Sequence, residues 1–185
     1  MIHRLGNCAY ACLFILASFG GLLAMQPANA QMSDPMSNIP KSKIGDSNLP
    51  IPRFVSIKSN KANARRGPGT DYPVIWQYRK AHLPLMVVDE YQAWRKLRDH
   101  DGSEFWMRGD LLSSNRYALT VVTDYAEPVR SRPDNKSLII ALLQKYSLVG
   151  LEECRGKFCR VETEHGAGWT KRNALWGALP NETIK

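Results

Sequence analysis

The chain has 185 residues, with 25 Lys and Arg against 17 Asp and Glu, so its formal charge is +8. The basic residues are mixed with acidic ones and form no run of five or six, which argues against a nucleic-acid-binding tail. A moderate positive charge favours other anionic partners, such as phosphorylated glycolipids, acidic peptides or anionic lipid head groups.

The first thirty residues follow the order of a secretory signal peptide. Arg4 precedes an uncharged, mostly apolar run from Cys8 to Met25, and Ala28-Asn29-Ala30 supplies a small-x-small cleavage site. The run is about as long as a minimal membrane span, but no basic stop-transfer cluster follows it. We therefore expect residues 1–30 to be removed on export, leaving a periplasmic chain with no stable membrane span and no nucleic-acid partner.

Residues 31–50 are rich in Ser and Pro and show no sustained hydrophobic period, which predicts a flexible linker. From Phe54 onward, short β-branched and aromatic runs alternate with Gly, Pro, Asn and Asp, which predicts an all-β fold of small strands. The nearest candidate for a helix is the apolar run Leu138–Tyr146. Its pattern fits a buried strand followed by a turn at least as well.

The sequence also contains an internal repeat. Asn63-Ala64-Arg65, followed by Pro68, recurs as Pro128-Val129-Arg130, followed by Pro133, at an offset of 65 residues. Later landmarks match in the same order: Val74 to Tyr78 with Ile139 to Leu143, Leu85 to Val88 with Leu148 to Leu151, Trp94 to Leu97 with Phe158 to Val161, and Trp106 with Trp169.

This repeat predicts two tandem domains, residues 51–114 and residues 117–179, the second of them divergent. A domain of about sixty residues is close to the lower limit at which a hydrophobic core folds unaided. The short connection from Leu111 to Leu119 also leaves little slack between the copies. We therefore expect the two copies to pack together over a common interface.

The landmarks of the first copy form a recognisable pattern: Asn63-Ala64-Arg65-Arg66-Gly67-Pro68, then Trp94-Arg95-Lys96-Leu97, then Gly102 and Trp106 ahead of Leu111-Leu112. This pattern resembles the bacterial SH3 family, whose usual form is Asn-Val-Arg-x-Gly-Pro followed by Trp-x-x-Val and Gly-Trp-Val. The resemblance spans most of residues 53–113 and implies a small SH3-like β-barrel. The second copy lacks the glycines beside Pro133 and carries Phe158 in place of the first tryptophan, so its assignment depends on the repeat.

Candidate ligand-binding residues lie in the first copy. Gly67-Pro68-Gly69 ends a strand, because Gly tolerates positive φ and Pro cannot continue a central ladder. The loop that follows should carry Asp71 and Tyr72 beside a groove. Trp94 begins a strand next to a turn, where an aromatic ring can wall a peptide or sugar site. With flanking cations, the predicted ligand set is Arg65, Arg66, Asp71, Tyr72 and Trp94.

Cys154 and Cys159 are the two cysteines beyond the predicted signal peptide, and in an exported chain such a pair most simply forms a disulfide. A redox pair wants two intervening residues rather than four, and His165 alone does not complete a zinc shell. Asp99-His100-Asp101 lies just before Gly102 and fits a solvated turn better than an acid–base pair. We therefore expect no catalytic residues, no metal and no cofactor.

The leading interpretation is a non-catalytic exported binding module that recognises a cell-wall peptide or glycan. An alternative is a protein–protein adaptor that docks an envelope enzyme or scaffold. A third interpretation is an anionic-lipid or polyanion binder driven by the positive charge.

Overall fold

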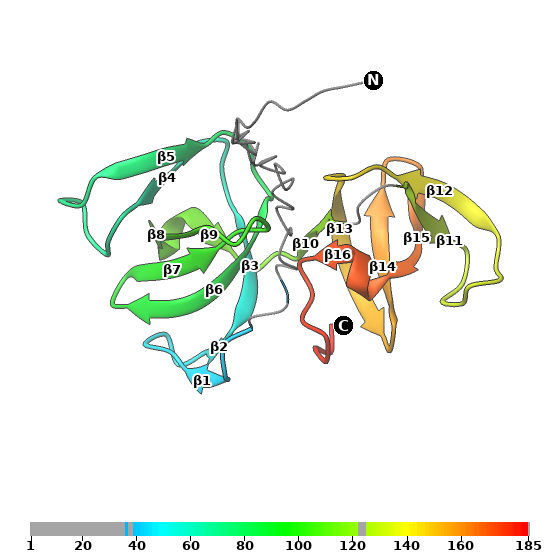
Figure 1. Ribbon diagram of the computed structural model, residues 1–185, viewed down its shortest axis with the longest axis horizontal. Helices are drawn as coiled ribbons and strands as arrows, with labels where there is room; N and C mark the ends of the chain where they lie inside the picture. Colours follow the sequence, from blue (N-terminus) through cyan, green and yellow to red (C-terminus); the bar gives the residue numbers. More distant parts are fainter. Residues whose placement is uncertain (1–35, 37–38, 122–124, 185) are drawn as a thin grey trace, which may run out of the picture. The chain divides into compact units, whose positions relative to one another are not determined.

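The computed structural model describes Met36, residues 39–121 and residues 125–184 (Figure 1). The predicted signal peptide, residues 1–30, lies outside these residues, as does the start of the predicted linker. In the described part of the chain, no helix is long and apolar enough to cross a membrane.

The first copy folds into one antiparallel sheet of seven strands. Its hairpins turn at Gln92 and Gly102, both with positive φ. The turn at Gly102 is the one that the sequence predicts. In spatial order the strands are β5 (Val74–Tyr78), β4 (Ala62–Arg65), β8 (Glu104–Arg108), β7 (Trp94–Arg98), β6 (Pro84–Tyr91), β3 (Arg53–Ile57) and β9 (Leu112–Ser113).

The second copy repeats this sheet strand for strand. A single 3-10 turn precedes the last strand of each copy: Gly109–Leu111 in the first and Arg172–Ala174 in the second. In the same spatial order its strands are β12 (Ile139–Leu143), β11 (Glu127–Arg130), β15 (Gly166–Lys171), β14 (Phe158–Thr163), β13 (Leu148–Arg155), β10 (Tyr117–Thr120) and β16 (Leu175–Trp176).

The two copies also agree in their irregularities. A register shift in the β4–β5 pair follows Ala64, and one in the β11–β12 pair follows Val129. The β6–β7 pair shifts after Val87 and the β13–β14 pair after Leu151. The predicted fold class, all-β with two tandem small domains, is therefore confirmed.

Each copy encloses its own core because inward and outward positions alternate along its strands. In β4 the two alanines are buried and the residues between and after them are half-buried, while in β8 Phe105 and Met107 are buried. The first core is built around Ile57, Leu85, Val87, Leu97 and Phe105, and the second around Val129, Val149, Val161, Cys159 and Leu175.

A third cluster joins the copies, as the small size of each copy led us to expect. The indole of Trp176, fully buried, packs edge-on against Phe54 with ring centroids 5.0 Å apart. Its Nε1–H donates to the backbone carbonyl of Pro84 at 3.1 Å. Met86, Val88 and Leu119 complete the cluster. The last strand of the second copy is thus anchored in the first.

The described half of the predicted linker is folded. β1 (Lys43–Ile44) pairs with β2 (Pro50–Ile51) around a turn in which Asn48 donates its N–H to the carbonyl of Gly45. The hairpin is held by Ile51, which is fully buried, and by polar contacts with β6 described below. The polar composition predicted a flexible linker. That prediction missed the hairpin because the polar residues bind partners more than forty positions along the chain, and no local sequence pattern reveals such contacts.

β12 is a strand, as its sequence indicated, but the expectation that it is buried was wrong. Leu138 is 73% exposed and Leu142 is 59% exposed, and Ile139 and Ile140 are exposed as well. The reason is topological. β12 lies at the edge of its sheet, with β11 as its one pairing partner among the described strands, so most of its side chains are uncovered and only Leu143 is buried.

The contact between the copies gives a stability prediction. Trp176→Ala removes a fully buried indole, its aromatic partner and its hydrogen bond, so we expect the free energy of unfolding to fall by about 3–5 kcal/mol. Chemical denaturation followed by circular dichroism measures this change. The control Leu138→Ala, at an exposed position, should change the free energy by less than about 0.5 kcal/mol. Equal effects of the two substitutions would contradict the assigned role of the cluster.

Candidate functional site

The arginine of the repeated motif organises a loop in both copies. Arg65 Nη1 donates to the carbonyl oxygens of Thr70, at 2.8 Å, and Tyr72, at 2.7 Å. Arg130 Nη1 donates in the same way to the carbonyl of Ser137, at 2.9 Å and again seven residues along the chain. Arg65 therefore holds the base of the loop that carries Asp71 and Tyr72.

In the loop of the first copy, the ring of Tyr72 packs against the backbone of Gly67 and Gly69. A Cβ at Gly67 would lie 2.3 Å from the Tyr72 ring, so any larger residue at this position would have to displace the ring. The ring is nevertheless 47% exposed, and Arg66 and Asp71 beside it are exposed too. The Gly-Pro-Gly sequence thus fixes Tyr72 in place without burying it.

The second copy closes the equivalent loop by polar contacts. Arg132 stands where the first copy has Gly67, and Ser137 stands where it has Tyr72. The Ser137 hydroxyl is buried and donates to the carbonyl of Arg132, at 3.0 Å. Asp134 Oδ1 accepts the backbone N–H of Ser137, at 2.7 Å. The second loop therefore lacks the exposed ring.

Trp94 lies on the same outer face of the first sheet as Arg65. Residues opposite each other in an antiparallel pair point to the same face. Arg65 is opposite Trp106, Trp106 is opposite Lys96, and Trp94 is two residues before Lys96 on the same strand. Trp106, half-buried, therefore lies between Trp94 and Arg65, and no ring contact joins Trp94 to Tyr72 among the described residues.

Charges on this outer face are largely paired. Glu104 accepts both Lys96, at 2.6 Å, and Arg98, at 2.7 Å, and Arg108 pairs with Asp110 at 2.8 Å. The face is thus aromatic and nearly neutral, whereas Arg66, in the loop that carries Tyr72, forms no ion pair with any residue that the structure describes.

Two further apolar side chains lie on the strand that follows the loop. Val74 and Trp76 of β5 are exposed, Trp76 to 38%. The Trp76 indole makes edge contacts with Phe105, at a centroid distance of 5.2 Å, and with Tyr78, at 6.4 Å, and part of it remains exposed. The predicted ligand set did not include them, because alternation alone does not show that β5 is an edge strand with both faces partly uncovered.

The turn at Asp99-His100-Asp101 is held by hydrogen bonds within it, as the sequence suggested. Asp99 Oδ1 accepts the backbone N–H groups of Asp101 and Ser103, at 3.1 and 2.9 Å. Its Oδ2 accepts the Tyr78 hydroxyl at 3.1 Å. Burial, with the nearby Asp99 charge, raises the pKa of Tyr78 well above its usual range, so this hydroxyl stays protonated. The position of Asp99 is therefore accounted for by these structural hydrogen bonds.

The two copies stabilise the equivalent hairpin, β6–β7 in the first and β13–β14 in the second, by different kinds of bond. The hairpin of the first copy pairs Glu90 with Arg95, and that of the second pairs Cys154 with Cys159. The predicted disulfide is present in the second copy. It closes a short loop, for which the chain-entropy model gives about 2 kcal/mol of stability.

In the first copy a buried carboxylate takes the place of that disulfide. Glu90, whose side chain is fully buried, accepts Arg53 at 2.6 Å and Arg95 at 2.9 Å. It also accepts the Ser47 N–H at 2.8 Å, which ties the β1–β2 hairpin to β6. Burial opposes ionisation of Glu90, but the hydrogen bonds from Ser47 and Arg53 outweigh it and hold the pKa of Glu90 below its usual range.

The comparisons with known proteins agree with this architecture. A sequence model described as the bacterial SH3 domain matches residues 58–114 and 126–177, one match in each copy. No curated protein matches the chain.

Solved structures that resemble the chain do so distantly. They include NlpC2 from Trichomonas vaginalis, at 14% identity over 69% of this chain and 48% of that one, with a TM-score of 0.32. An NlpC/P60 family protein from Bacillus cereus ATCC 10987 has 14% identity over 71% of this chain and 58% of that one, with a TM-score of 0.30. The chain spans about half the length of these proteins.

The Glu90 cluster gives a prediction on acid stability. Because its folded-state pKa is depressed, Glu90 stabilises the fold fully above about pH 4.3, and this contribution is lost as the pH falls through the lower folded-state value. Glu90→Gln leaves Arg53 and Arg95 without a charged partner, so we expect it to cost about 3–5 kcal/mol at pH 7.

Urea unfolding of the two proteins at several pH values between 3 and 7 measures the effect. Glu90→Gln should flatten the fall in stability below about pH 4.3. The control Asp89→Asn removes an exposed pair with Lys43 and should cost less than about 1 kcal/mol. An unchanged pH dependence in Glu90→Gln would refute the assignment.

Proposed function

The chain belongs to the bacterial SH3 domain family, and on that premise we propose that it is a non-catalytic binding module of the cell envelope. In this proposal the first copy holds a peptide or glycan strand of the cell wall. The observation that carries the proposal is the Tyr72 ring, which is fixed on Gly67 and yet 47% exposed.

An exposed, immobilised ring is a favourable contact for a ligand. Its apolar face is already ordered, so binding costs little side-chain entropy, and its hydroxyl can still meet water or a polar group. Val74 and Trp76, which follow on β5, extend the apolar surface along the strand. A sugar ring or an extended peptide presents faces of this kind.

Charged groups beside the ring supply polarity. Arg66 and Asp71 are exposed, and neither has an ion-pair partner in the described part of the chain. Wall peptides carry both carboxylates and amines. The carboxylates can pair with Arg66 and the amines with Asp71, while Tyr72 contacts an apolar part of the ligand. Trp94, on the neighbouring outer face, would lie farther along the same ligand.

The proposed location is the periplasm. The disulfide between Cys154 and Cys159 is the kind of bond that persists in an oxidising compartment. Residues 1–30 have the order of a signal peptide, which accords with export.

Sedimentation with purified wall sacculi tests the proposal. The protein should sediment at low salt, and Tyr72→Ala and Arg66→Ala should each weaken binding by about tenfold or more without loss of stability. The control Leu138→Ala removes an apolar side chain of the second copy that is even more exposed than Tyr72, and it should leave sedimentation unchanged. A protein that stays in the supernatant at low salt would refute wall binding.

A second candidate function is a protein–protein adaptor, and the edge strand β12 favours it. In the first copy, Asn63 and Gln77 face each other across β4 and β5 and share a hydrogen bond of 2.7 Å. In the second copy Pro128 and Leu142 face each other at the same place. An apolar edge strand can accept a strand from a partner protein through backbone hydrogen bonds.

Cross-linking in cells followed by mass spectrometry separates the two candidates. One dominant protein partner, recovered less well with Leu142→Gln, would support the adaptor, because this substitution restores the first copy's residue at an exposed position. Recovery of wall fragments alone, unaffected by Leu142→Gln, would exclude it.

A further inference from the structure

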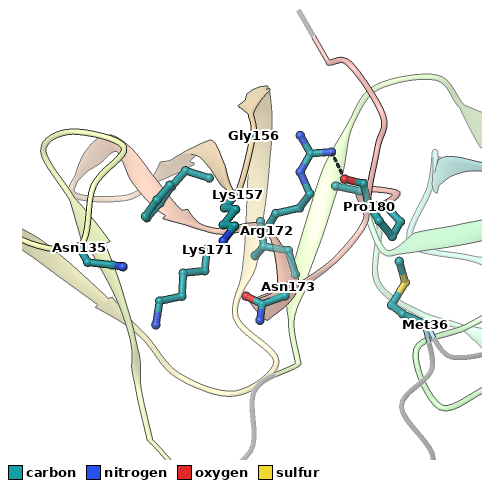
Figure 2. Close-up of a pocket in the computed structure, with 11 residues that line it drawn as sticks. Met36, Asn135, Gly156, Lys157, Lys171, Arg172, Asn173 and Pro180 are labelled. Atoms are coloured by element: carbon teal, nitrogen blue, oxygen red, sulfur yellow. Dashed lines mark hydrogen bonds between the residues drawn. The ribbon is translucent and has the colours of Figure 1, made fainter.

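The second copy has a pocket that its sequence did not predict. It has a volume of about 770 Å³, within the range of small-ligand sites. Figure 2 shows Lys157, Lys171, Arg172 and Asn173 among its lining residues. The ring of Phe158 and the side chain of Leu175 add apolar surface.

The matching corner of the first copy shows what is special about this pocket. The N–H of Gly109 donates to the carbonyl of Ala93 at 2.9 Å, and the N–H of Arg172 donates to the carbonyl of Lys157 at the same distance. Trp94 faces Arg108 across its hairpin, as Phe158 faces Lys171. The two corners are therefore equivalent residue by residue.

Charge differs sharply between the two corners. In the first copy Ala93 and Gly109 are uncharged, and Arg108 is neutralised by Asp110 at 2.8 Å. In the second copy Lys157 and Arg172 replace the two uncharged residues, Lys171 replaces Arg108, and Asn173 replaces the acid. At these four matched positions one balanced ion pair has thus become three cations and no anion. The corner of the first copy also holds the Arg95 guanidinium, beside Gly109, but Glu90 neutralises it at 2.9 Å.

None of these cations has a carboxylate partner among the residues that the structure describes. Lys157 and Lys171 are exposed and form no ion pair there. Arg172 is only 8% exposed, and its Nη1 donates to the carbonyls of Leu179, Pro180 and Glu182, at 2.8, 3.1 and 2.8 Å. Its buried Nε has no hydrogen-bond partner.

The nearby acids are engaged elsewhere. Glu182 is bound by Arg116, Glu153 by Arg155 and Glu152 by Arg160. A cluster of like charges with no counter-charge raises the local concentration of anions, most strongly where low-dielectric walls surround it. The pocket is therefore electrostatically incomplete without an anion.

We propose that this pocket binds a phosphate monoester group. Such a group carries a charge of about −1.5 to −2 at neutral pH, which suits three cations better than the single charge of a carboxylate does. Lysine ammonium groups bind phosphate as point charges, and the amides of Asn135 and Asn173 offer further donors at the rim. Phe158 and Leu175 accommodate the sugar or lipid to which the phosphate is attached.

This inference goes beyond the proposed function, since it concerns the other copy and a different chemistry. The Tyr72 surface and this pocket share no residue. Loss of wall binding in Tyr72→Ala therefore leaves phosphate binding intact, and each proposal can fail separately.

Titration calorimetry of the purified protein with three probes tests the proposal. Glucose 6-phosphate and inorganic phosphate represent the soluble source, and vesicles of phosphatidylcholine with phosphatidic acid represent the lipid source. Binding of at least one phosphate probe is expected, and which one binds identifies the source. Absence of heat with all three, or equally tight binding of succinate, overturns the proposal.

Substitutions taken from the first copy provide the matched variants. Lys157→Ala restores the residue found at Ala93, and Asn173→Asp restores the acid found at Asp110. Each should weaken binding of the phosphate probe by about tenfold or more. Lys157→Ala removes a charge-assisted contact, and Asn173→Asp adds a carboxylate that pairs with the cations and repels phosphate. The control Lys80→Ala removes an exposed lysine of the first copy and should have no effect.

Thermal unfolding checks that the variants are folded, and both exposed positions should tolerate the change with an unaltered midpoint. If Lys80→Ala weakens binding as much as Lys157→Ala does, the attraction is one of overall charge, and the assignment of the pocket is refuted.

Discussion

Two barrels of about sixty residues each depend on the buried contact of Trp176 with the first copy, because units of this size bury too little apolar surface to be secure alone. The indole fills the space between Phe54, Met86 and Leu119, and its N–H satisfies the carbonyl of Pro84. The strand that ends the second sheet thereby anchors the second copy on the first. Each copy has its own core, and this third cluster adds burial that the two copies share.

The outer parts of the two copies have diverged around one common feature. Both keep the motif arginine, which holds its loop by donating to a carbonyl seven residues on. Elsewhere the two copies stabilise equivalent hairpins by different interactions. The β6–β7 hairpin is braced by buried Glu90 between two arginines, and the β13–β14 hairpin by a disulfide. The brace of the first copy loses strength in acid, whereas a disulfide does not titrate.

Divergence also separates the two candidate surfaces by chemistry. The first copy offers a glycine-supported ring beside one cation and one anion, a surface suited to a neutral or zwitterionic strand. The second copy has lost the ring and gathered uncompensated cations at the corner that follows β15.

The sequence by itself determined what depends on neighbours along the chain. Period-two alternation placed β4, β5, β7 and β8, and glycine positions such as Gly102 placed the turns. Cys154 and Cys159 were paired because they are the two cysteines beyond the predicted signal peptide of an exported chain. The sequence also singled out the loop of Asp71 and Tyr72. Tertiary structure decided the rest: the exposure of β12, the tie between Ser47 and Glu90, and the cationic pocket. These features depend on which distant segments become neighbours, because burial and charge compensation are properties of contacts in space and leave no period in the chain.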